Sequence, residues 1–94
     1  MTREFFKVKG VVTHIGELVH IQREGIPDLY KKVLTLETID GQILYPEIRN
    51  KKLTMLDEKE IYPNSTVEIE FSFEGSEKNG KRYNNVHIKS IKKL

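Results

Sequence analysis

Tyrosine rings and cationic side chains stand next to each other at several points in this sequence. Tyr30 precedes Lys31, Tyr83 follows Arg82, and Tyr45 comes shortly before a run of basic residues. An aromatic ring can stack on a nucleobase, while lysine and arginine neutralise phosphates. Because proteins that hold single-stranded nucleic acids combine the two, this pattern indicates binding of such a strand.

Catalytic chemistry has little support in the sequence. There is no cysteine, which excludes disulfides, thiolate metal sites and a cysteine nucleophile. His14, His20 and His87 are scattered, without an HExxH motif, an acidic cluster at metal-ligand spacing or a glycine-rich phosphate loop. A metal site at His14 and His20 is an alternative to two polar residues on a strand face. We expect no enzyme, no catalytic residue, no metal and no cofactor.

Size and composition predict one small domain covering residues 1–94. The chain is 37% hydrophobic and 32% charged, as in soluble globular domains. No apolar run approaches the ~20 residues of a membrane span, and Phe5-Phe6 is too short for a signal peptide. We therefore expect a cytoplasmic location. The net charge is only +2, but basic residues cluster at 49–52, 81–82 and 89–93. Such segregation can form a basic face; ordinary solubilising charge is the alternative.

Alternating apolar and polar residues predict the strands. The alternation is strict over residues 67–74, and residues 30–39 form a second strand, with Leu34 and Leu36 on one face. Asp40-Gly41 predicts a hairpin with positive φ at both residues, leading into a strand that starts at residue 42. Asn79-Gly80 predicts a second hairpin with a longer, flexible loop over residues 75–82.

The remaining segments predict the shape that these strands adopt. Residues 5–15 form a long first strand in which Gly10 marks a bend of the kind that closes a small barrel. Residues 25–28 form a loop, and residues 51–60 form one helix capped by Asn50. The order of three strands, a helix and two strands predicts an all-β, five-stranded OB-fold Greek-key barrel, with a sandwich as the alternative.

Short motifs along nearly the whole chain strengthen this interpretation. They are Gly10-Val11-Val12, residues 31–38, residues 46–53, residues 67–71 and residues 79–85. In this succession the chain resembles small bacterial and phage single-stranded DNA-binding proteins and related OB-like domains. The resemblance implies single-stranded DNA as the ligand. The chain departs from that family in having no tryptophan on its binding strands and in ending on Ile91-Lys92-Lys93-Leu94 rather than an acidic tail. These departures favour a reduced phage or mobile-element relative.

The parity of residues within each strand predicts which side chains face outward. If Leu44, Pro46 and Ile48 face the core, Tyr45 and Arg49 project outward together. In the last strand Val86 and Ile88 face inward, which places a tyrosine, an amide, a histidine and a lysine on the outer face. Phe71 and Phe73 are in step with the core positions 67 and 69, so we expect both to be buried.

We expect non-sequence-specific binding of single-stranded DNA by this outer face and the 75–82 loop, with a possible homo-oligomer and no membrane. The alternatives are a protein-binding OB-like adaptor in a phage or mobile-element assembly, or an RNA-binding OB domain. The expected binding residues are Tyr30, Lys31, Tyr45, Arg49, Lys51, Lys52, Lys78, Lys81, Arg82, Tyr83, Asn85, His87 and Lys89.

Overall fold

Strands dominate the computed structural model, which describes residues 4–94. Residues 1–3 lie outside the described part. They belong to the N-terminal segment in which the sequence predicts no signal peptide. The elements, in chain order, are β1 (Phe6–Ile15), β2 (Val19–Ile21), β3 (Leu29–Thr38), β4 (Ile43–Leu44), β5 (Glu47–Arg49), the 3₁₀ turn η1 (Asn50–Leu53), α1 (Thr54–Glu58), β6 (Thr66–Lys78) and β7 (Lys81–Lys93). Within the described residues no helix is long and apolar enough to cross a membrane.

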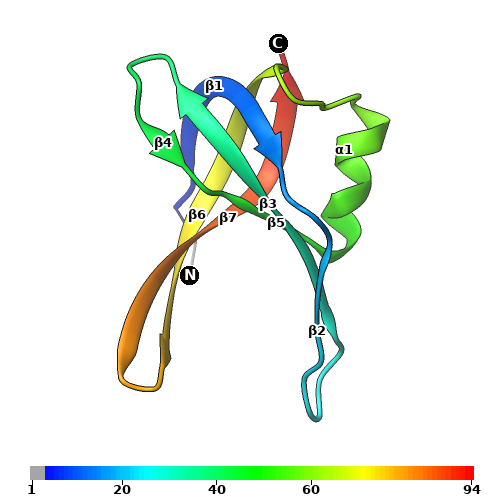
Figure 1. The fold of residues 1–94 in the computed structure, drawn as a ribbon, viewed down its shortest axis with the longest axis vertical. Coiled ribbons are helices and arrows are strands. Elements are labelled where there is room, and N and C mark those ends of the chain that lie inside the picture. The colour runs from blue at the N-terminus through cyan, green and yellow to red at the C-terminus, as the bar shows by residue number, and fades with distance from the viewer. Residues whose placement is uncertain (1–3) are drawn as a thin grey trace.

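Five strands close into a barrel (Figure 1). β1 pairs with β6 through its first half and with β3 through its second half, both antiparallel. β6 continues the ring to β7, and β5 links β7, in parallel, to β3. This closed order, with a short helical segment between β5 and β6, confirms the predicted OB-fold Greek-key barrel.

The bend predicted at Gly10 is the point where β1 passes from one partner to the other. Gly10 lies opposite both Val67 on β6 and Thr38 on β3. A Cβ atom here would lie well inside contact distance of the Glu37 carbonyl oxygen. A side chain at this position would therefore push β1 away from β3, so the absence of one lets the barrel close.

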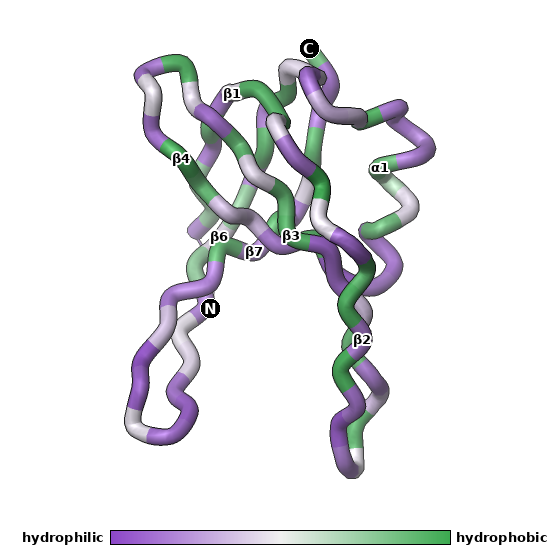
Figure 2. The backbone as a smooth tube through the Cα atoms, in the orientation of Figure 1, coloured by the Kyte–Doolittle hydropathy of each residue, from purple (hydrophilic) through white to green (hydrophobic). Residues whose placement is uncertain are grey.

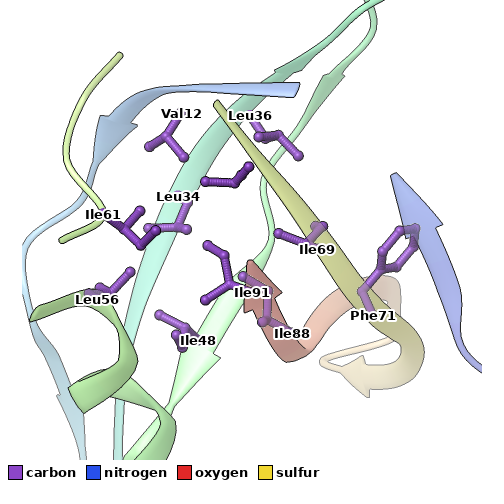
Figure 3. Close-up of a cluster of buried hydrophobic side chains, with 11 residues drawn as sticks. Val12, Leu34, Leu36, Ile48, Leu56, Ile61, Ile69, Phe71, Ile88 and Ile91 are labelled. Carbon is purple, nitrogen blue, oxygen red and sulfur yellow. The ribbon is translucent and has the colours of Figure 1, made fainter. Parts of the chain in front are cut away.

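The core fills the barrel interior with aliphatic side chains, as Figure 3 shows. Leu34 and Leu36 of β3 are both buried on the predicted face, and Ile48 of β5 is fully buried. Leu56 of α1 and Ile61 cover one side of the same cluster. Burial of this apolar surface is the main favourable term for folding.

The helix is shorter than predicted and is not capped by Asn50. It consists of η1 followed by α1, which ends at Glu58. Asn50 has a φ of 50° and lies inside the first turn, where its Oδ1 accepts a hydrogen bond from the Tyr30 backbone N–H at 3.1 Å. The side chain therefore ties η1 to β3 instead of capping a helix.

Two further predictions were wrong in detail. In the turn after β3 only Gly41 has a positive φ, at 86°, because the Gly41 N–H bonds to the Thr38 carbonyl in a three-residue loop rather than a two-residue turn. Phe73 is 57% exposed although Phe71 is buried. The reason is that β1 pairs with β6 only as far as Phe71, so Phe73 lies beyond the closed barrel.

Candidate functional site

Two β-hairpins project from the same end of the barrel (Figure 1). The β2–β3 arm covers residues 17–30, and the β6–β7 arm covers residues 74–85. The hairpin predicted at Asn79-Gly80 is confirmed, and its φ values of 52° and 76° make it a tight two-residue turn. The prediction of a long, flexible loop over residues 75–82 is wrong, because β6 and β7 stay paired up to Lys78 and Lys81. The β6–β7 arm is mostly hydrophilic, whereas apolar residues alternate along the β2–β3 arm (Figure 2).

The sequence predicted the loop at residues 25–28 and the strand that follows it, but it did not predict β2 or its pairing with β3. Val19, His20 and Ile21 pair with Lys31, Tyr30 and Leu29, respectively. The available signal was the alternation of residues 19–21, followed by a turn with Gly25 at a φ of 73°. All three β2 residues are exposed, so the alternation of apolar and polar residues in this strand does not correspond to one buried face.

A network of ion pairs lies at the base of the two arms, on the outer face of β3 and β5. Lys31 Nζ is 2.9 Å from Glu47 Oε1, and Arg49 Nη2 is 3.3 Å from the same oxygen. Arg49 Nη1 also lies 3.0 Å from Glu74 Oε2 on the β6–β7 arm. The Arg49 side chain lies on this outer face, but it is only 15% exposed because Glu47 and Glu74 cover it. Two carboxylates already neutralise Lys31 and Arg49.

Beside this network lies a hollow that retains unpaired cations; we call it the cationic hollow. Its lining residues are Arg23, Leu29, Arg49, Asn50, Lys51, Lys52 and His87. Within residues 4–94, Arg23, Lys51 and Lys52 form no ion pair. Arg23 donates two hydrogen bonds to the Pro27 carbonyl oxygen, which position the guanidinium without neutralising its charge.

His87 of β7 lies on the wall of the cationic hollow. Burial lowers the pKa of its imidazole, and the nearby positive charges of Arg49 and Lys52 lower that pKa further. The neutral form is therefore favoured while the hollow holds only cations. A bound anion would offset the repulsion from these charges and favour the protonated form.

Tyr45 and Tyr83 are the tyrosines with free rings among the predicted site residues. Tyr45 is 63% exposed on the segment between β4 and β5, and Tyr83 is 47% exposed on the β6–β7 arm. Tyr30 is 40% exposed, but its ring is stacked on His20 with centroids 4.4 Å apart and planes 6° from parallel. His20 Nε2–H in turn donates a hydrogen bond to Asp28 Oδ2 at 2.8 Å. Tyr30 therefore offers one ring face, and His20 covers the other, a contact that the sequence did not predict.

A second hollow on this face has an aromatic wall, and we call it the Tyr45 hollow. It is lined by Val33, Ile43, Leu44, Tyr45, Glu47, Asn84, Asn85 and Val86. The Asn85 Nδ2 donates a hydrogen bond to Ser76 Oγ at 3.3 Å across the β6–β7 arm, and Asn84 has no side-chain bond to the described residues. Apolar side chains and carboxamides thus meet beside an exposed ring.

The other predicted residues do not join these hollows. Lys78, Lys81 and Arg82 lie exposed near the tip of the β6–β7 arm, with the Arg82 Nε 3.9 Å from Glu77 Oε2. Lys89 lies away from β5: its Nζ is 3.1 Å from Glu70 Oε1 and 4.1 Å from the centroid of the Phe5 ring. No group of three or more potential metal ligands occurs within residues 4–94, and His14 and His20 form no such site there.

Comparisons with known proteins identify the fold. No family model and no curated protein sequence matches the chain. Three solved structures are similar over nearly their whole length. The dimeric N-terminal domain of PriB from Thermoanaerobacter tencongensis has a TM-score of 0.55 and 14% identity, over 96% of this chain and 94% of that one.

The other two are described as single-stranded DNA-binding proteins. The small protein from Streptomyces coelicolor has a TM-score of 0.53 and 9% identity, over 100% of this chain and 96% of that one. The mitochondrial protein from S. cerevisiae has a TM-score of 0.54 and 16% identity, over 100% and 97%. At these identities the comparisons establish a shared fold: the chain is an OB barrel of the shape found in these three proteins.

Proposed function

We propose that this protein is a non-enzymatic binder of single-stranded DNA, holding the strand without a sequence requirement across the face between its two arms. The observation that carries the proposal is the placement of unpaired cations and free aromatic rings on one face. The cationic hollow holds Arg23, Lys51 and Lys52. The exposed Tyr45 ring lies on the segment that leads into β5, and the exposed Tyr83 ring lies on the β6–β7 arm, two residues before Asn85 of the Tyr45 hollow. Phosphates and stacked bases need these two kinds of group side by side.

Each kind of residue has a distinct role in this proposal. Lys51, Lys52 and Arg23 neutralise phosphates in the cationic hollow. Lys78, Lys81 and Arg82 contact the strand from the β6–β7 arm. Tyr45, Tyr83 and the free face of Tyr30 stack on bases, and Asn85 and His87 line the path between them. Lys31 and Arg49 position Glu47 and the arm, while Lys89 contributes general positive charge.

The similar folds support this choice of ligand. Two of the structures compared above are described as single-stranded DNA-binding proteins, and the PriB domain is described as a dimer. One barrel covers only about 4–16 nucleotides, so joining copies would strengthen binding through avidity. We therefore also propose a homo-oligomer, and a cytoplasmic location where such strands are available.

Fluorescence anisotropy with a labelled oligo-dT, at low and then moderate salt, tests the proposal. Affinity should fall steeply with salt because phosphate binding releases counterions. The same titration with oligo-rU separates DNA from RNA, since a preference for the RNA strand would favour the RNA-binding alternative. Absence of oligo-dT binding at low salt would contradict the proposal.

A protein-binding adaptor is the second candidate, and an exposed aromatic cluster favours it. The Phe6 ring lies 5.3 Å from Phe73 and 5.9 Å from Phe71, and both Phe6 and Phe73 are largely exposed where β6 leaves the barrel. An apolar interface of this kind would keep its affinity as salt rises, whereas nucleic-acid binding would not. Salt dependence therefore separates the two candidates.

A further inference from the structure

The Tyr45 hollow has the composition of a site for a single flat ring. Val33 and Val86 are half-buried apolar residues of its lining, and the exposed Tyr45 lines it with an aromatic ring. Asn84 and Asn85 are the amide-bearing residues of the same lining. Ligand sites commonly combine apolar walls with a few placed polar groups in this way, and an unstacked base is recognised by a ring on its face and polar groups on its edge.

Glu47 gives this hollow a chemical preference. All the hydrogen bonds that Glu47 receives from Lys31 and Arg49 end on Oε1. Within residues 4–94, Oε2 has no hydrogen-bond partner. No fully buried side-chain oxygen or nitrogen in these residues lacks such a partner, so Oε2 is not fully buried. Glu47 is 5% exposed, so Oε2 retains a small accessible surface, and the Tyr45 hollow is the hollow that Glu47 lines. A carboxylate oxygen only accepts hydrogen bonds, so it selects a ligand that donates one.

We propose that the Tyr45 hollow holds one nucleobase of the bound strand and favours bases with an exocyclic amino group, which donates to Glu47 Oε2. This inference rests on the proposed single-strand binding and adds a base preference to it. Cytosine presents such an amino group, and a carboxylate accepts from it. Uracil presents a carbonyl oxygen at the same position, and its only ring N–H lies between two carbonyls that repel a carboxylate.

The test compares labelled oligomers of dC and dU of equal length, about ten nucleotides each, by anisotropy at fixed salt. The two pyrimidines have the same ring size, so stacking and phosphate contacts are matched. The native protein should bind the dC oligomer about five-fold more tightly. An oligomer of 2-pyrimidinone, which lacks the amino group, should lose this preference. Equal affinity for the dC and 2-pyrimidinone oligomers would overturn the proposal.

Two variants locate the preference on the protein. Glu47→Gln retains the shape of the side chain but adds donors, so the ratio of dC to dU affinity should fall to about one. Glu74→Gln removes the other carboxylate that pairs with Arg49 and lies outside the Tyr45 hollow, so it should preserve the native ratio. A ratio unchanged in Glu47→Gln would contradict the assignment to Oε2.

The design separates failure of this inference from failure of the proposed function. If the oligomers bind with equal affinity, single-strand binding stands and the base preference is overturned. If none of them binds at low salt, both proposals fail. If Glu47→Gln does not fold, which its thermal melt would reveal, the 2-pyrimidinone oligomer still decides the question on the native protein.

Discussion

Whether a cation on this face can hold a phosphate depends on the carboxylates beside it. Lys31 and Arg49 share Glu47, and Arg49 also pairs with Glu74, so their charge is compensated within the protein. Lys51 and Lys52 are separated from Arg49 in sequence only by Asn50 but have no such partner in the described structure. Two neighbouring groups of basic residues therefore have different roles, one structural and one available to an anion.

At the residue scale, the free tyrosine rings should contribute stacking energy. Tyr45→Ala and Tyr83→Ala should each weaken oligo-dT binding by about 1–3 kcal/mol, because each loses a platform for one base. Anisotropy titrations at one salt concentration measure the change. Tyr62→Ala is the matched control, since Tyr62 is 55% exposed but lies in the turn before β6, away from the face between the arms. An equal loss in Tyr62→Ala would argue against stacking on this face.

His87 should make the stability of the fold depend on pH. Its pKa in the folded protein lies below the ordinary value of 6.5, because burial and then the charges of Arg49 and Lys52 disfavour the protonated form. The unfolded chain therefore binds more protons in this range. As far as His87 is concerned, the free energy of unfolding should be highest above about pH 6.5. It should fall as the pH decreases through that value toward the folded-state pKa.

Denaturant unfolding measured from neutral pH down to about pH 5 tests this dependence. His87→Gln should flatten the curve in that window. The lowered pKa values of Asp28 and Asp40, caused mainly by hydrogen bonds from His20 and Thr38, respectively, act below their ordinary value of 3.8 and so do not interfere. A curve with the same slope in His87→Gln would assign the pH dependence to other groups.

At the scale of elements, β1 serves two partners because it bends at a residue without a side chain. Its first half completes the ladder with β6 and its second half the ladder with β3. This double pairing closes the barrel, and closure holds the two arms at the same end of the molecule (Figure 1). The position of the two arms therefore depends on the close approach of β1 to β3 at Gly10, which lies outside the site.

Gly10→Ala should destabilise the protein by about 1–3 kcal/mol, because the added methyl group collides with the Glu37 carbonyl and strains the β1–β3 pairing. Gly75→Ala is the control: a Cβ there has its nearest neighbour at 4.0 Å, so stability should stay within about 0.5 kcal/mol. Denaturant midpoints compare the two variants. A neutral Gly10→Ala would mean that β1 and β3 can separate at little cost.

At the scale of the whole molecule, the distribution of charge matters more than its sum. The net charge is +2, yet the cationic hollow gathers unpaired cations while Glu47 and Glu74 are occupied by ion pairs. Such local concentration of one sign attracts a polyanion to a nearly neutral protein, and salt screens the attraction.

The double variant Lys51→Ala/Lys52→Ala should reduce the magnitude of the slope of log affinity against log salt by about 1.4, because each lost phosphate contact on a single strand removes about 0.7. Oligo-dT titrations over a salt series measure this slope. Lys7→Ala/Lys9→Ala makes the same change in net charge on β1, away from the cationic hollow, and should change the slope much less. Equal slopes in the two double variants would mean that the hollow makes no specific phosphate contact.

Sequence patterns alone were enough to predict the barrel and much of its detail. Alternation from Val67 to Phe71, the paired leucines of β3 and the positive φ of Asn79 and Gly80 are local features, in which a residue's own conformational preference or its side-chain parity decides the outcome. The order of these elements was enough to predict an OB barrel.

Which side chains on the predicted face are free depends on contacts between elements that are distant in the sequence. Arg49 pairs with Glu74 from a strand 25 residues away, Tyr30 stacks on His20 across the arm, and Phe73 is exposed because β1 ends beside Phe71. The parity of a strand states which way a side chain points, but not which group it meets there. Charge compensation and ring stacking depend on distances between separate elements, and these distances are fixed only when the barrel closes.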